Sequence, residues 1–82
     1  MYQVILTQRA LKDLNAMNQH LQDRIVGKLN DYVEDPLKYA KKLSNTKMGD
    51  YRFKIGDYRA IFDINDEEIV ILRIGHRKDI YK

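Results

Sequence analysis

The sequence predicts a single α+β domain in which two helices cover one face of an antiparallel sheet. Three observations predict this class: a strand-like segment begins the chain, two stretches with helical spacing follow, and three strand-like segments come last. The length of 82 residues suits one hydrophobic core, so we expect residues 1–82 to form one domain. A content of 44% hydrophobic and 33% charged residues excludes a disordered or low-complexity chain.

The N-terminal half is predicted to be a strand followed by a helical hairpin. Residues 2–6 form the strand, and Thr7 is a suitable N-cap for the first helix. The apolar helical positions are Ala10, Leu11, Leu14 and Met17, then Leu21, Ile25, Leu29, Tyr32 and Val33. Residues 15–20 join the helices, and Pro36 ends the second. Gly27 costs this helix about 1 kcal/mol relative to alanine, so we expect it to admit a closely packed neighbour.

The C-terminal half is predicted to be a basic connection and a three-stranded meander. The connection spans residues 37–49 and the tail spans 75–82. The strands are 50–55, 58–64 and 68–74. Between the first two strands, the two-residue turn Gly56-Asp57 begins with glycine, which favours a type II′ hairpin.

This tight turn predicts which side chains of the hairpin share a face. Lys54 is expected directly opposite Arg59, with Arg52 on the same side, because side chains alternate along a strand. The other side carries the residues expected under the helices: Tyr51, Phe53, Ile55, Tyr58, Ala60 and Phe62. Because the helices cover one face only, the cations are expected on an open face, where Asp63 is their one acidic neighbour. A slip of one residue in the register would exchange the faces.

The cationic face indicates a site for a phosphodiester. Like charges directly opposite in a sheet are destabilising, so stability alone does not explain the Lys54–Arg59 pair. Residues 38–54 contain six cations and a single acid, and such a field favours polyanions, nucleic acid first. The alternative is a solvated surface whose long side chains spread apart in water at little cost.

The C-terminal tail adds three candidate residues. Arg77 carries a planar fork that matches phosphate. Tyr81 can stack on a base or exchange a proton, and His76 is a candidate acid or base because histidine exchanges protons near neutral pH. The structural alternatives are a solvent-facing histidine and a tyrosine that anchors the tail to the sheet. For Arg73, an ion pair with Asp63 and a place at the sheet edge both remain open.

Other chemistries find little support. There is no cysteine, which excludes a disulfide, a thiolate zinc site and a cysteine nucleophile, and with two histidines we expect no metal and no cofactor. No phosphate-binding glycine loop or nucleophile-elbow motif is present. No apolar stretch is long enough to span a membrane and no signal peptide is apparent, so we expect a cytoplasmic protein without a membrane partner.

Four runs of residues carry a family resemblance, namely Lys42-Leu43, Tyr51-Arg52-Phe53-Lys54, Gly56-Asp57-Tyr58-Arg59 and Gly75-His76-Arg77-Lys78-Asp79-Ile80-Tyr81. With them the sequence resembles the RelE/ParE superfamily of bacterial and archaeal toxins over essentially the whole chain. The resemblance implies a RelE-like fold and the toxin of a type II toxin–antitoxin system. The implied activity is that of an mRNA interferase, a ribosome-dependent endoribonuclease that cuts mRNA in the A site without a metal. The 2′-hydroxyl attacks the adjacent phosphodiester and leaves a 2′,3′-cyclic phosphate and a 5′-hydroxyl.

The resemblance also implies site residues and partners. Lys54, Arg59, Arg77 and Tyr81 match the catalytic positions of the family, and we assign RNA or phosphate binding to Arg52, His76, Lys42 and Lys47. Arg52 stands where RelE has a lysine. Arginine stays protonated in proteins, so the base would be Tyr81, Lys54 or His76. The implied partners are a RelB-type antitoxin, the ribosome and mRNA, with operator DNA bound only through the antitoxin complex.

Two other functions remain open at this stage. One is a ParE-type, non-enzymatic inhibitor of DNA gyrase, which shares the fold and generally lacks the catalytic set. The presence of arginine rather than lysine at position 52 keeps this alternative open. The other is a toxin fold that has lost its activity and acts only as a partner in an autoregulatory DNA-binding complex.

Overall fold

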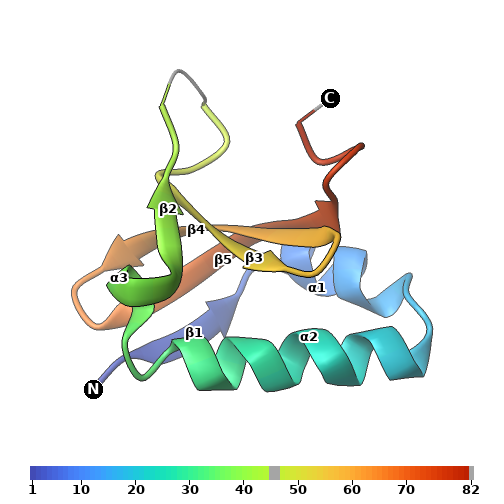
Figure 1. Ribbon diagram of the computed structural model, residues 1–82, viewed down its shortest axis with the longest axis horizontal. Helices are drawn as coiled ribbons and strands as arrows, with labels where there is room; N and C mark the ends of the chain where they lie inside the picture. Colours follow the sequence, from blue (N-terminus) through green and yellow to red (C-terminus); the bar gives the residue numbers. More distant parts are fainter. Residues whose placement is uncertain (45–46, 82) are drawn as a thin grey trace.

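The chain folds into a five-stranded mixed sheet with two helices on one face (Figure 1). The computed structural model describes residues 1–44 and 47–81. The elements are β1 (Gln3–Leu6), α1 (Gln8–Asn15), α2 (Gln19–Tyr32), α3 (Pro36–Tyr39), β2 (Ala40–Lys42), β3 (Tyr51–Ile55), β4 (Tyr58–Asn65) and β5 (Glu68–His76). The strand order is β1-β5-β4-β3-β2. The predicted α+β class and the antiparallel β3-β4-β5 meander are confirmed. No helix in the described ranges is long and apolar enough to cross a membrane.

Side-chain caps begin both long helices. The Thr7 hydroxyl oxygen accepts a hydrogen bond from the backbone N–H of Ala10 at 3.2 Å, which confirms the predicted N-cap of α1. Asn18 caps α2 in the same way, through the N–H of Leu21 at 2.9 Å, so the link between the helices is shorter than predicted. The close neighbour expected at Gly27 is wrong: a Cβ added there would meet nothing within 4 Å.

The N-terminal strand joins the sheet by parallel pairing with β5, which the sequence pattern did not predict. Its register runs from Gln3 opposite Glu68 to Leu6 opposite Ile71. Parallel neighbours need a long crossover connection, and here α1 and α2 lie within that connection. The strand pairing and the helix layer therefore arise together.

Asp13 of α1 takes over the edge of β5 where β1 ends. Its Oδ2 accepts hydrogen bonds from the backbone N–H of Ile74 at 3.0 Å and from Nε of Arg73 at 2.8 Å. Of the two alternatives left open for Arg73, the ion pair with Asp63 is not formed, and the side chain pairs with Asp13 instead. Asp63 instead accepts the backbone N–H of Asp50 at 2.7 Å.

The segment expected to be an irregular basic connection contains two further elements. Pro36 occupies the first turn of α3, which suits a residue without a backbone N–H. Ala40–Lys42 then form β2, which pairs with β3 as the edge of the sheet. A strand of three residues with two lysines carries too little alternation to be recognised from sequence, so its partner strand defines it.

The predicted register of the β3–β4 hairpin is confirmed in full. Lys54 lies opposite Arg59, and Ile55 lies opposite Tyr58. Gly56 has a φ of +58°, the left-handed conformation that the first position of a type II′ turn requires. Three residues that we expected under the helices are fully buried in the core: Phe53, Ala60 and Phe62.

We expected the second face of the sheet to be open, but part of it is covered. Residues 77–81 lie on the side of the sheet away from α2 (Figure 1). Ile80 in this segment is 2% exposed, and its atoms lie 3.4 to 3.7 Å from a Cβ built on Gly75. At Gly49, an added Cβ would lie 2.7 Å from Cγ2 of Ile61, which is fully buried on this face. The tail and the segment before β3 therefore cover the β4–β5 part of this face.

Candidate functional site

Two cross-strand pairs of cations lie on the second face, across β2, β3 and β4. Lys54 pairs with Arg59, and Lys41 pairs with Arg52. These residues alternate with the buried side chains under the helices, so all of them are directed to the other side. The register therefore brings together four positive charges on the part of this face formed by β2, β3 and the start of β4.

Lys41 is the residue that sequence reasoning missed, because β2 was not predicted. Lys42, the predicted phosphate ligand, pairs with Tyr51 and so lies on the helix side of the sheet. Both lysines lie on the edge strand and both are exposed. They differ only in the face of the sheet to which their side chains are directed. Recognition of residues 40–42 as a strand would have placed the two lysines on opposite faces by alternation.

Arg59 is held rigidly by the hairpin turn. It is 9% exposed, and its Nη1 donates hydrogen bonds to the carbonyl oxygens of Gly56 and Tyr58, both at 2.8 Å. Among the described residues, no buried side-chain nitrogen or oxygen lacks a hydrogen-bond partner. The site thus contains one cation fixed by the turn carbonyls, next to the exposed side chain of Lys54.

An aromatic cluster anchors the backbone of Lys54. The hydroxyl of Tyr32 donates to the carbonyl oxygen of Lys54 at 3.2 Å. The ring of Tyr32 packs against Phe53 with centroids 5.1 Å apart and stacks on Tyr39 at 4.5 Å. Tyr32 at the end of α2 therefore supplies a hydrogen bond to a β3 carbonyl that β2 does not reach, and it fixes the backbone position that carries Lys54.

Arg77 is brought to the same turn from the far end of the chain. Its backbone N–H donates to the carbonyl oxygen of Asp57 at 2.8 Å, and its Nε lies 3.7 Å from Oδ1 of Asp57. Both side chains are exposed, at 55% for Arg77 and 70% for Asp57. Arg59 and Arg77 therefore contact neighbouring parts of one turn, although 18 positions separate them in the sequence.

His76 is placed apart from these cations. It is the cross-strand partner of Tyr58, against which its ring packs edge-to-face at 5.3 Å, so it belongs to the helix side. Its Nδ1 accepts the backbone N–H of Lys78 at 3.1 Å. A neutral imidazole that accepts at Nδ1 carries its proton on Nε2, which can donate a hydrogen bond.

The remaining candidates lie on exposed segments. Tyr81 is 48% exposed and follows Ile80, which is the buried anchor of the tail. A turn closes this tail, since the N–H groups of Asp79 and Ile80 both donate to the carbonyl of His76, at 2.9 and 3.0 Å. Lys47 is exposed in the segment that precedes Gly49.

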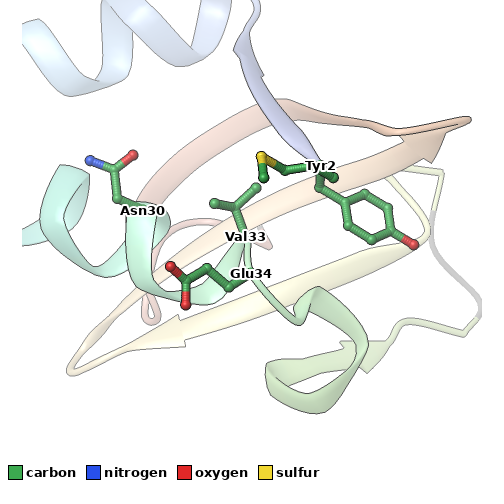
Figure 2. Close-up of a pocket in the computed structure, with 5 residues that line it drawn as sticks. Tyr2, Asn30, Val33 and Glu34 are labelled. Atoms are coloured by element: carbon green, nitrogen blue, oxygen red, sulfur yellow. The ribbon is translucent and has the colours of Figure 1, made fainter.

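A pocket of about 440 Å³ lies elsewhere, between the N-terminus and the end of α2. Figure 2 shows the residues that line it, which are Met1, Tyr2, Asn30, Val33 and Glu34. None of the cations described above lines this pocket. The candidate site is therefore a cationic surface of the sheet, which suits an extended polyanion better than a small enclosed ligand.

Comparison with known proteins identifies the family. Residues 4–81 match the family model described as the ParE toxin of the type II toxin–antitoxin system parDE. The chain is 33% identical to toxin RelG of Mycobacterium tuberculosis, covering 99% of this chain and 97% of that toxin. It is 31% identical to toxin RelE3 of Methanocaldococcus jannaschii, covering 95% of this chain and 93% of that toxin.

The structure of the chain is also similar to solved structures of toxin–antitoxin complexes. The M. tuberculosis toxin–antitoxin complex RelBE2 contains a chain that matches with a TM-score of 0.83 and 30% identity, covering 93% of this chain and 98% of that one. The RelE–RelB complex of Pyrococcus horikoshii matches with a TM-score of 0.74 and 28% identity, covering 95% and 97%. The fold and the matches define a toxin of a type II toxin–antitoxin system. The chain belongs to the RelE/ParE superfamily, and its named relatives are RelE-type toxins.

Proposed function

We propose that this toxin is an mRNA interferase that cuts mRNA in the ribosomal A site without a metal ion. The observation that carries the proposal is the pairing of Lys54 with Arg59 and of Lys41 with Arg52 on one face, with Arg77 held at the adjoining turn. A sheet surface of this kind suits a phosphodiester backbone. The RelE-type names of the relatives support the same activity.

The proposed reaction is an attack by the 2′-hydroxyl on the adjacent phosphorus. The bond from O2′ to phosphorus forms while the bond from phosphorus to O5′ breaks. The 2′-hydroxyl proton passes to a base, and the leaving 5′-oxygen takes up a proton. The products are a 2′,3′-cyclic phosphate and a 5′-hydroxyl.

Positive charge at the reacting phosphate is the main contribution of the protein to this step. The phosphorane-like state carries extra negative charge, which Lys54, Arg59 and Arg77 would stabilise. By analogy with an oxyanion-hole donor, each of these cations lowers the activation free energy by about 3 kcal/mol. The rigid attachment of Arg59 to the turn supports this role, since a preorganised cation needs no reorientation during the reaction.

The general base is proposed to be Tyr81, Lys54 or His76, since Arg52 remains protonated. Lys54 and Tyr81 have exposed side chains, and Nδ1 of His76 accepts the backbone N–H of Lys78. The ring of Tyr81 can also stack on a base of the codon and hold it for in-line attack. Arg77 is suited to stabilise the leaving 5′-oxygen.

A RelB-type antitoxin is the proposed protein partner. The solved relatives are RelB–RelE complexes. The cationic face favours an acidic partner segment, which would cover the same cations that bind mRNA. Operator DNA would be contacted only through that complex, and the ribosomal target places the free toxin in the cytoplasm.

The decisive experiment uses purified toxin and ribosomes programmed with a defined mRNA and an empty A site. Mapping of the 5′ ends should show cuts inside the A-site codon, and free mRNA should stay intact. Lys54→Ala and Arg77→Ala should abolish cutting while their thermal unfolding remains cooperative. Unchanged cutting by both variants would reject the assigned site.

Inhibition of DNA gyrase is the second candidate function. The matched family model carries the ParE name, and Arg52 departs from the lysine expected in RelE. A supercoiling assay with purified gyrase separates the two proposals. Inhibition of supercoiling by folded toxin that leaves ribosome-bound mRNA intact would favour this second function.

A further inference from the structure

Three arginines from different parts of the chain converge on the turn between β3 and β4. Arg59 donates to the carbonyls on both sides of Asp57, and Arg77 contacts Asp57 itself. Arg24 of α2 is the third, since its Nη2 would lie 2.8 Å from a Cβ added to Gly56. Asp57 is the acid of this turn, and its carboxylate forms an ion pair with Arg77.

Asp57 holds Arg77 at two points. The backbone hydrogen bond of 2.8 Å fixes where the tail leaves β5. The carboxylate then approaches the guanidinium from its Nε edge, at 3.7 Å. The Arg77 side chain stays 55% exposed in this contact, so its guanidinium remains accessible to a phosphate.

We propose that Asp57 is a positioning residue that orients Arg77 toward the phosphate of the cleaved bond. This inference rests on the proposed ribonuclease function. An arginine side chain with 55% exposure samples many rotamers unless a partner restricts it, and the Asp57 carboxylate is that partner. An exposed ion pair adds little to folding stability, so its loss should appear in the reaction rather than in unfolding.

The charge of Asp57 gives the proposal a distinctive signature. Removal of the acid that pairs with Arg77 makes the surface more positive, which by itself strengthens binding to ribosomal RNA and mRNA. Loss of orientation at Arg77 slows the chemical step instead. A positioning role therefore predicts unchanged or tighter binding together with slower cleavage, whereas a damaged surface would weaken both.

The test measures single-turnover cleavage on programmed ribosomes over a range of toxin concentrations. Asp57→Asn should lower the maximal rate constant about tenfold, with an unchanged or lower half-saturating concentration. Asp31→Ala is the control, because it removes one exposed acid of α2 and leaves the turn intact. The control should cut at the wild-type rate. A wild-type rate in Asp57→Asn, or a loss with clearly weaker binding, would overturn the proposal.

A double-mutant cycle tests whether the effect acts through Arg77. In an Arg77→Lys background, which keeps the charge and removes the fork, Asp57→Asn should change the residual rate less than twofold. An equal loss in both backgrounds would show that Asp57 acts by another route and would overturn the proposal.

A second measurement does not depend on activity. With ¹⁵N-labelled arginine, the Nε–H group of Arg77 should exchange with water several-fold faster in Asp57→Asn than in the wild type. Equal exchange would overturn the proposed contact. A wild-type toxin that cuts no ribosome-bound mRNA would reject the proposed function, while this comparison still decides whether Asp57 orders Arg77.

Discussion

Lys54 and Arg59 lie directly opposite one another in the β3–β4 hairpin, and one is exposed while the other is buried. Two like charges in this relationship destabilise a sheet. The hairpin offsets the cost at Arg59, because the carbonyls of Gly56 and Tyr58 accept its hydrogen bonds. Arg59 therefore serves the fold as well as the site, whereas Lys54 remains available to a ligand.

This difference predicts unequal effects of the two residues on stability. Arg59→Ala should lower the free energy of unfolding by about 1–3 kcal/mol, because two partly buried hydrogen bonds to the carbonyls of the turn are lost. Lys54→Ala should leave it nearly unchanged, since its side chain is exposed and a repulsion is relieved. Urea unfolding of both variants measures the difference. Equal effects would mean that the turn does not depend on the Arg59 contacts.

The strand β2 predicts different roles for two adjacent lysines. Lys41 shares a face with Arg52, whereas Lys42 is directed to the helix side. Lys41→Ala should weaken binding to ribosomes and reduce the slope of log K against log salt concentration by about 0.7–0.9. Lys42→Ala removes the same charge and should change both quantities less. Binding titrations over a range of potassium chloride concentrations compare this matched pair, and equal slopes would argue against the assigned faces.

Gly27 is expected to limit the stability of α2. A Cβ at this position meets no atom within 4 Å, so a larger residue creates no clash in the free toxin. Gly27→Ala should raise the free energy of unfolding by about 0.5–1 kcal/mol, because alanine restricts the unfolded chain and favours the helix. Denaturant unfolding of the toxin alone measures this gain. A loss of stability would imply a contact at Gly27 that the described structure does not contain.

Gly49 is expected to behave in the opposite way. An added Cβ would lie 2.7 Å from Cγ2 of Ile61 and 2.9 Å from Cδ1 of Leu72, both closer than carbon atoms normally approach. Gly49→Ala should therefore lower the free energy of unfolding by about 1–3 kcal/mol as the segment before β3 is displaced from the sheet. The comparison with Gly27→Ala in one experiment is informative, since the same substitution should have opposite signs.

Part of the candidate site could be predicted because it depends on local geometry. The pairing of Lys54 with Arg59 follows from a two-residue turn and from alternation along two strands, and both extend over a few residues only. The placement of Lys41 beside Arg52, and of Lys42 on the helix side, could not be predicted for the opposite reason. The strand that directs these lysines exists only because β3 lies beside it.

The surroundings of the site depended on contacts between distant segments. The tail reaches the turn through the backbone hydrogen bond from Arg77 to Asp57, and its burial rests on Ile80 against Gly75. Arg73 pairs with Asp13 of α1, and this carboxylate lies at the edge of β5 beyond the end of β1. No periodicity in the sequence reports which carboxylate will lie at the edge of a strand, because that is set by how the helix layer packs on the sheet.

The sequence by itself determined the α+β class, the capped first helix, the hairpin register and the face on which Lys54 and Arg59 lie. Each of these follows from side-chain period, a cap or a turn residue, which act over one or two turns of chain. Only the tertiary structure decided that β1 pairs with β5, that Arg59 is buried, and that Arg77 joins it at the Asp57 turn. These outcomes depend on which apolar surfaces pack together and which backbone groups form hydrogen bonds between distant segments. The local sequence pattern does not determine those pairings.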